Sequence, residues 1–323
     1  MTHALAPFIA ASVLAAGALP AHAADYPTKA IRIVVPYASG GSTDALARMV
    51  GEQLGKRLGQ AAIVENKPGA SEQIAITSVT KATPDGYTIL LSTLSGLAVN
   101  PGLYGTKLPY DPLKDLAPVL LAATVPSVVV VHPSVPAKTM AELGSYLKAN
   151  QGKVSYASAG NGTSAHLAAE LFKAMTGAPM LHVPYRGSGP ALIDMITGQV
   201  HVMFDTLTSS VQHIRDGKLR ALAVTTATPS PALPGTPTVA ETVPGFEVTA
   251  WFGVGVPKGT PPAVIEKLNR EINAALNDPK IRARLAELGA VPFVATPAQM
   301  VAHVAAETEK WGKAVQFSGA RVD

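Results

Sequence analysis

Short apolar runs alternate with amphipathic stretches along most of this chain. The apolar run at residues 31–37 ends in a Gly-Gly turn, and residues 43–58 then carry apolar side chains at every fourth position. A short apolar run predicts a buried strand, and a spacing of three to four predicts a helix with one buried face.

The same two signals recur along the chain. Further strands are predicted at 61–65, 87–93, 128–132, 154–157, 181–184, 200–204, 219–225 and 251–256. Further helices are predicted at 71–81, 141–150, 165–176, 190–197, 210–215, 262–276, 280–288 and 297–314. Strands that alternate with helices predict an α/β protein in which helices cover a parallel sheet.

The alternation is interrupted at residues 226–243, where four prolines indicate a connection rather than an element. Two α/β units precede this segment, and the part that follows it is too short for a third. We therefore expect a discontinuous first domain, residues 24–125 plus 227–323, and a second domain, residues 126–226. The chain would cross between them twice, and such a hinge suits a protein that closes around a ligand.

The N-terminal segment predicts export. Residues 1–23 contain no Lys, Arg, Asp or Glu, and an apolar run from Leu5 to Leu19 precedes Ala21-His22-Ala23. The run is shorter than the roughly 20 residues that span a membrane, and the Ala-x-Ala sequence is typical of a cleavage site. We predict a signal peptide cleaved after Ala23 and a mature protein in the periplasm. An uncleaved anchor is the alternative, and the absence of a basic residue before the run is irregular.

The amino-acid composition excludes several classes of protein. The 323 residues are 47% hydrophobic and 15% charged, with no cysteine, which excludes a disulfide scaffold, a thiol enzyme and an iron–sulfur protein. The net charge of +4 comes without a Lys/Arg-rich run, so we expect no nucleic-acid partner. No two histidines have the spacing of a zinc-binding helix, so we expect no metal and no cofactor.

Two predicted strand-to-helix loops carry the candidate chemistry. Helix N-termini have unpaired N–H groups and a partial positive charge, and glycine lets an anion approach the backbone. The candidate ligand-binding residues of the first loop are Tyr37, Ser39, Gly40, Gly41 and Thr43. Those of the second loop, in the other predicted domain, are Ala159, Gly160, Gly162, Thr163 and His166. Facing each other across a hinge, the loops would hold a ligand with two carboxylates, or with one carboxylate and another polar end.

Simpler readings of these residues stay open. The first loop can be a capped helix start with Ser42 as N-cap, and His166 can serve capping or packing. Asp205, at the carboxyl end of a predicted strand, can accept a hydrogen bond from a ligand or cap the next turn. The Gly160-x-Gly162 sequence resembles a dinucleotide fingerprint but lacks its acidic residue. Residues 69–73 miss the last glycine of a nucleophile elbow, so we expect no enzyme.

Several longer motifs make the chain recognisable. They include YPTKAIRIVVPYASGGSTDALAR from Tyr26, VENKPGA from Val64, ATPDGYTILLSTLS from Ala82, VSYASAGNGTSAHLAAELF from Val154 and HVPYRGSGPALIDMITGQVHVMFD from His182. With these motifs the chain resembles the substrate-binding proteins of tripartite tricarboxylate transporters, the Bug-type extracytoplasmic receptors. The resemblance runs from Tyr26 to about residue 317, nearly the whole mature chain.

The resemblance implies a class II periplasmic-binding-protein fold, with two doubly wound α/β domains joined by a two-crossing hinge. It implies that the two loops grip a small carboxylate, such as a di- or tricarboxylate, an acidic amino acid or an aromatic acid. Ser92, Ser95 and Asp205 would be wall residues that set specificity. The partner would be a membrane transporter of the tripartite tricarboxylate type, and we expect a monomer. An exported hydrolase-like enzyme and a sensor that feeds a signalling receptor are the alternatives.

The chain departs from the family pattern after its PGA motif. The family commonly continues with Gly-Gly-Asn-Ile-Gly, whereas this chain has Ser71-Glu72-Gln73-Ile74-Ala75. If this loop faces the cleft, Glu72 would oppose an anionic ligand, which would make the ligand unusual. The milder interpretation is a charge in the first turn of a helix.

Overall fold

The structure is a computed structural model that describes residues 26–318. The predicted signal peptide and its cleavage site lie outside these residues. Within residues 26–318, no helix is both long enough and apolar enough to cross a membrane.

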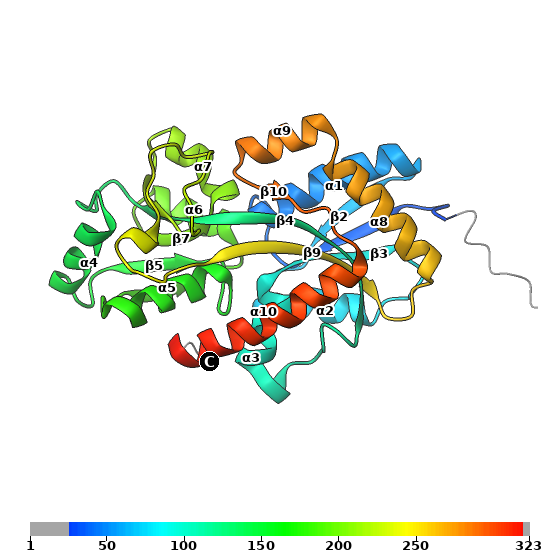
Figure 1. The fold of residues 1–323 in the computed structure, drawn as a ribbon, viewed down its shortest axis with the longest axis horizontal. Helices are drawn as coiled ribbons and strands as arrows, with labels where there is room; N and C mark the ends of the chain where they lie inside the picture. Colours follow the sequence, from blue (N-terminus) through cyan, green and yellow to red (C-terminus); the bar gives the residue numbers. More distant parts are fainter. Residues whose placement is uncertain (1–25, 319–323) are drawn as a thin grey trace, which may run out of the picture.

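Strands and helices alternate through most of the chain (Figure 1). The strands are β1 (Ile31–Val35), β2 (Ala62–Asn66), β3 (Thr88–Thr93), β4 (Leu116–Val131), β5 (Ser155–Ser158), β6 (Leu181–Pro184), β7 (Val202–Thr206), β8 (Arg220–Val224), β9 (Thr249–Pro257) and β10 (Val291–Pro292). The helices are α1 (Ser42–Leu58), α2 (Gln73–Thr80), α3 (Asn100–Tyr104), α4 (Met140–Ala149), α5 (Ser164–Thr176), α6 (Ser188–Ile196), α7 (Leu207–Arg215), α8 (Pro262–Leu276), α9 (Pro279–Glu287) and α10 (Pro297–Ser318).

The strands follow the order β2-β1-β3-β9-β4-β7-β5-β6, with β8 and β10 also paired to β4. Parallel pairs lie at both ends of this order, and the pairs that involve β4 and β9 are antiparallel. Strand β4 belongs to two ladders, because residues 116–126 pair with β9 and residues 127–131 pair with β7 and β8. Figure 1 shows β4 running through the molecule between the two groups of helices.

Helices cover both faces of each part of the sheet. Helices α1 and α8 pack on one face of the first part, and α2 and α10 pack on the other. In the second part, α4 and α5 cover one face, while α6 and α7 cover the other. Helix α10 also contacts α5, so the last helix touches both parts.

The domain boundaries expected from the sequence stay predictions. Near the first boundary, β4 changes its pairing partners at residues 126–127. After β8, Phe246 packs against Phe172 and Phe204, with ring centroids 6.5 and 6.3 Å away. The end of the segment between β8 and β9 therefore lies beside α5 and β7, just before the chain enters β9.

Local sequence signals predicted the ends of several helices correctly. Helix α8 has the predicted bounds, and the Thr139 hydroxyl accepts a hydrogen bond from the Glu142 amide at the start of α4. The predicted helix at 71–81 is shorter, because residues 70–72 have positive φ angles and α2 begins only at Gln73. Residues 116–127 of β4 and the short helix α3 were not predicted.

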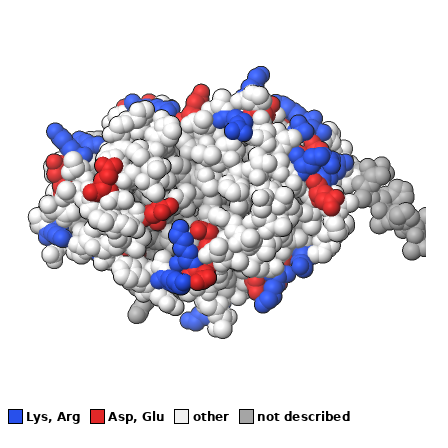
Figure 2. Space-filling view, in the orientation of Figure 1, with Lys and Arg blue, Asp and Glu red and all other residues white. Residues whose placement is uncertain are grey.

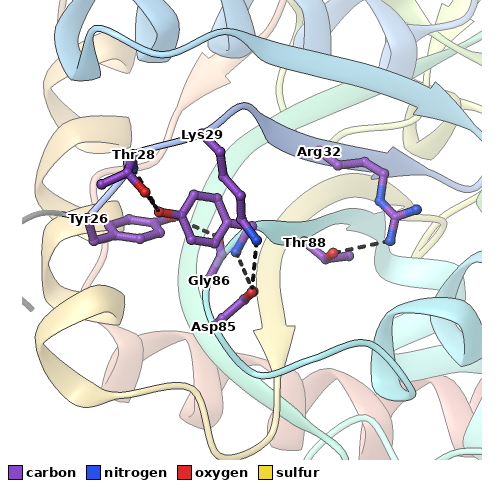
Figure 3. Close-up of polar contacts among 8 residues, drawn as sticks. Tyr26, Thr28, Lys29, Arg32, Asp85, Gly86 and Thr88 are labelled. Carbon is purple, nitrogen blue, oxygen red and sulfur yellow. Dashed lines mark hydrogen bonds and ion pairs between the residues drawn. The ribbon is translucent and has the colours of Figure 1, made fainter. Parts of the chain in front are cut away.

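The chain that enters β1 is tied to the turn before β3 (Figure 3). The Tyr26 hydroxyl donates to the Gly86 carbonyl over 2.7 Å, and Lys29 pairs with Asp85 at 3.5 Å. Gly86 has a φ of +82°, and a Cβ there would lie 2.3 Å from Val264 Cγ1. Two motifs that are about 60 residues apart in the sequence thus form one packed corner.

Candidate functional site

A cavity opens where the two predicted binding loops meet. Its empty volume, counted together with the open solvent at its mouth, is about 430 Å³. The first loop, between β1 and α1, contributes Tyr37, Gly41, Ser42 and Thr43. The second loop, between β5 and α5, contributes Ala159, Thr163, Ser164 and Ala165. The other lining residues are Thr93, Ser188, Asp205, Thr206, Ala250 and Phe252.

Gly41, not Ser42, is the N-cap of α1. Its backbone is extended, with φ −92° and ψ 176°, and no side chain caps the helix. The Asp44 carboxylate accepts from the Gly40 amide at 3.1 Å, and Arg48 and Asn66 also donate to it. These hydrogen bonds lower the pKa of Asp44 against the opposing effect of burial. The alternative of Ser42 as N-cap is therefore wrong, and the Gly41 side of the helix start faces the cavity.

The second loop is held by its own side chains. The Thr163 hydroxyl accepts from the His166 amide at 3.3 Å and caps α5. The His166 Nδ1 accepts from the Gly162 amide at 3.1 Å. In an α-helix the first amides have no intrahelical acceptor, so the Ser164 and Ala165 amides are donors at the cavity wall.

His166 supports the loop and does not line the cavity. Its ring stacks on His182 at 4.4 Å, and His182 stacks on Tyr156 at 4.7 Å. Burial lowers the pKa of His166, and burial followed by the neighbouring His166 lowers the pKa of His182 to about 4. Both rings are therefore neutral at pH 7, which lets His166 Nδ1 accept a hydrogen bond.

The first loop contacts the segments that follow β6 and β7 across the cavity. The Ala38 amide donates to the Arg186 carbonyl at 2.9 Å. The Ser42 amide donates to the Ser209 hydroxyl at 3.1 Å, and the Thr206 hydroxyl donates to the Ser42 hydroxyl at 3.0 Å. The cavity is thus closed by direct hydrogen bonds between segments from the two parts of the sheet.

Asp205 lies at the end of β7 in the cavity wall and is only 1% exposed. The hydroxyls of Ser188 and Ser210 each donate to its carboxylate at 2.6 Å. Burial raises the pKa of Asp205 to about 6, although these hydrogen bonds oppose the rise. Its own donors satisfy the carboxylate, so it can lie beside an anionic ligand with less repulsion than an unpaired charge.

Glu72 is the acidic group beneath the first loop. Its carboxylate accepts from the Tyr37 hydroxyl at 2.6 Å, from the Thr93 amide at 3.3 Å, and from the hydroxyls of Ser92 and Thr93. Burial raises the pKa of Glu72, and these hydrogen bonds lower it. A second, outer cavity of about 1140 Å³ is lined by Glu72, Tyr37 and Ala159, so the carboxylate lies between the two cavities.

The predicted site residues are not all at the cavity. Tyr37, Gly41, Thr43, Ala159, Thr163 and Asp205 line it, and Gly160 lines the outer cavity. Ser39 and Gly40 are exposed, Gly162 and His166 support the second loop, and Ser92 and Ser95 are buried under Tyr37 and Thr93. Their assignment as ligand-binding residues stays a prediction.

The sequence reasoning missed several lining residues. Thr93, Ser188 and Thr206 lie at or just after the ends of β3, β6 and β7, and Phe252 comes from β9. The rule that ligands bind at the carboxyl ends of strands could have found the first three. The described residues contain no group of three or more His, Asp or Glu that could hold a metal ion.

The chain is similar to known proteins over most of its length. Residues 46–319 match the Tripartite tricarboxylate transporter family receptor family, TctC. Protein BugT of Bordetella pertussis is 40% identical over 98% of this chain and 96% of its own length. The solved structure of R. palustris Rpa4515 with adipate covers 92% of this chain and 100% of that chain, at 40% identity and a TM-score of 0.89.

A second solved structure, MatC from Rhodopseudomonas palustris with bound malate, covers 90% of this chain and 100% of that chain. It is 33% identical, with a TM-score of 0.86. Neighbours of this similarity are periplasmic binding proteins, so the predicted fold class is confirmed. Their family consists of solute-binding receptors rather than enzymes, and this chain belongs to it, the tripartite tricarboxylate transporter receptor family.

Proposed function

We propose that this receptor captures a small carboxylate in the cavity between its two loops and delivers it to a membrane transporter of the tripartite tricarboxylate type. It would act in the periplasm, as a monomer, after loss of its signal peptide. The observation that carries the proposal is the convergence of two helix N-termini, those of α1 and α5, on one cavity.

The chemistry of the wall favours an anion. Of the described residues, neither Lys nor Arg lines this cavity, so the attraction comes from helix dipoles, backbone amides and hydroxyls. Thr43 and Ser164 supply hydroxyl donors beside the Ser164 and Ala165 amides. Phe252 and Ala250 provide an apolar wall for a carbon skeleton. The ligands named for the two solved neighbours, adipate and malate, are carboxylates.

The hydrogen bonds between the first loop and the segments that follow β6 and β7 support a delivery role. A ligand held by both loops would favour the closed arrangement over an open one, and a transporter can recognise the closed form. Charged groups do not mark one docking face on the side shown in Figure 2, where Lys, Arg, Asp and Glu are intermixed around a broad uncharged area. We therefore base the choice of transporter on the family.

A thermal-shift panel of mono-, di- and tricarboxylates, acidic amino acids and aromatic acids tests the proposal. At 100 times its dissociation constant, a specific ligand adds about 2.7 kcal/mol to the free energy of unfolding. If a neutral solute stabilises the protein and no acid does, the proposal is wrong.

Gly41→Val is the matched site variant. A Cβ at Gly41 would make ordinary contacts, 3.7 Å from Ser188, so the fold tolerates it while the added methyl groups enter the cavity. Gly144→Val in α4 is the control, since a Cβ there has nothing within 4 Å. We expect Gly41→Val to lose carboxylate binding and Gly144→Val to keep it. Equal affinities would remove the first loop from the site.

A further inference from the structure

We propose that Glu72 sets the charge of the ligand: its side chain is a built-in carboxylate that occupies donors at the cavity wall. The ligand would then present one carboxylate to the helix N-termini and an end without negative charge toward Glu72. This inference rests on the proposed function and names the ligand class, a monocarboxylate, within it.

The donors held by Glu72 belong to the cavity itself. Tyr37 and Thr93 both line it, and both donate their hydroxyls to the Glu72 carboxylate. Ser92 and the Thr93 amide complete a set of four donors. A second carboxylate on the ligand would find these donors taken and a like charge beside it. In either protonation state, the carboxyl group of Glu72 fills the same space.

No Lys, Arg or His among the described residues forms an ion pair with this group. Among residues 26–318, the ion pairs do not include Glu72, although the side chain is only 1% exposed. A buried carboxylate without a cationic partner is costly, and four donors are the compensation that the fold provides. The donor set is therefore one that receives a carboxylate, and the chain supplies that carboxylate itself.

The backbone is constrained to place the side chain there. Ala70, Ser71 and Glu72 have φ angles of 45°, 51° and 74°, a left-handed region that L-residues other than glycine rarely adopt. Three hydrogen bonds hold the middle residue: the Ser71 hydroxyl donates to the Asn161 carbonyl at 2.5 Å, and Asn100 and Tyr104 donate to Ser71 at 2.7 and 2.9 Å. Strain of this kind persists where the surroundings enforce it, and it occurs often at binding sites.

Glu72→Gly is the direct test. Glycine adopts the φ of +74° without a Cβ penalty, so we expect the variant to fold, with the four donors facing a vacated space. Calorimetry would compare matched acids, succinate with butyrate and adipate with hexanoate, on the wild-type protein and the variant. We expect the wild-type protein to bind the monoacid of at least one pair more tightly. The variant should move the affinity ratio at least tenfold toward the diacid. Acetate should raise the melting temperature of the variant more than that of the wild-type protein, because the variant has a second set of free donors.

Two further variants keep the test interpretable. Ala70→Gly relieves a positive φ without touching the carboxylate, so it should keep the wild-type ratio. Glu72→Gln keeps the shape without the charge and should move the ratio the same way by a smaller factor, which covers a failure of Glu72→Gly to fold.

The outcomes separate the two proposals. An unchanged ratio in both Glu72 variants, or a wild-type preference for every diacid, overturns the role of Glu72 and leaves carboxylate binding intact. If neither the wild-type protein nor any variant binds an acid, while a neutral solute binds, the proposed function fails.

Discussion

The ionisation of Asp205 should make the stability of this protein fall as the pH rises from 4 to above 6. Burial raises the pKa of Asp205 from 3.8 to about 6 in the folded protein. The folded state therefore holds this proton at pH values where the unfolded chain has released it. The stabilisation is complete below pH 3.8 and is lost as the pH passes the folded-state pKa.

The magnitude follows from the two pKa values. The full difference corresponds to about 3 kcal/mol of unfolding free energy. Between pH 4.5 and 7.5 the unfolded-state carboxyl is largely ionised at both ends of the range, so the change expected there is about 2 kcal/mol. The group is buried and screened little by solvent, so we expect weak dependence on salt.

Urea unfolding of the wild-type protein and of Asp205→Asn at pH 4.5, 5.5, 6.5 and 7.5 measures this change. Other groups titrate in the same range, but they contribute equally to both proteins, so the difference between the two curves isolates Asp205. The amide is neutral at every pH and can still accept from Ser188 or Ser210. We expect the wild-type protein to lose about 2 kcal/mol relative to the variant across this range. Parallel curves would show that the carboxyl is not held above its ordinary pKa.

Two more predictions concern packing away from the cavity. Gly86→Ala should cost more than about 1 kcal/mol in urea unfolding, because its φ is +82° and the new Cβ would overlap Val264. Gly59 has a φ of +69° and open space around a Cβ, so Gly59→Ala measures the cost of the backbone conformation alone. If both variants lose the same free energy of unfolding, the overlap with Val264 contributes nothing. Glu307→Leu should cost about 2 kcal/mol or more and shift tryptophan emission, because both indole N–H groups of the chain donate to that carboxylate. Glu307→Gln retains an acceptor and should cost less.

The parts of the fold that were predictable are those with local causes. Helix α8 begins at a proline and has a continuous apolar face, so its bounds follow from sequence alone. Strand β4 was only partly found because Pro118 and Pro126 suggest breaks. In the fold, Pro118 lies at a shift of register with β9, and Pro126 lies where the strand changes partners. Such places tolerate proline, but only the distant strands reveal them.

The candidate site also contains residues that a local sequence signal predicts and residues that only the packing reveals. Gly41 and Thr163 were predicted as site residues because a strand, a small-residue turn and a helix start are contiguous in the sequence. The place of Ser92 was not predictable, because successive residues of a strand face opposite sides and only the packing shows that Thr93 faces the cavity. The direction of the Glu72 side chain depends on three consecutive residues with left-handed φ angles. None of them is a glycine, so no local signal in the sequence predicted this direction.

Strand β4 gives this receptor a mechanical property. Since one strand is hydrogen-bonded into both parts of the sheet, any rotation of one part against the other twists a backbone held by ladders on either side. We therefore expect the two parts to have a preferred relative angle, with an energetic cost for rotation away from it. The work of this rotation enters the apparent affinity for every ligand equally. Substitutions in β4 near residue 126 should therefore tune how tightly the receptor binds without altering what it selects.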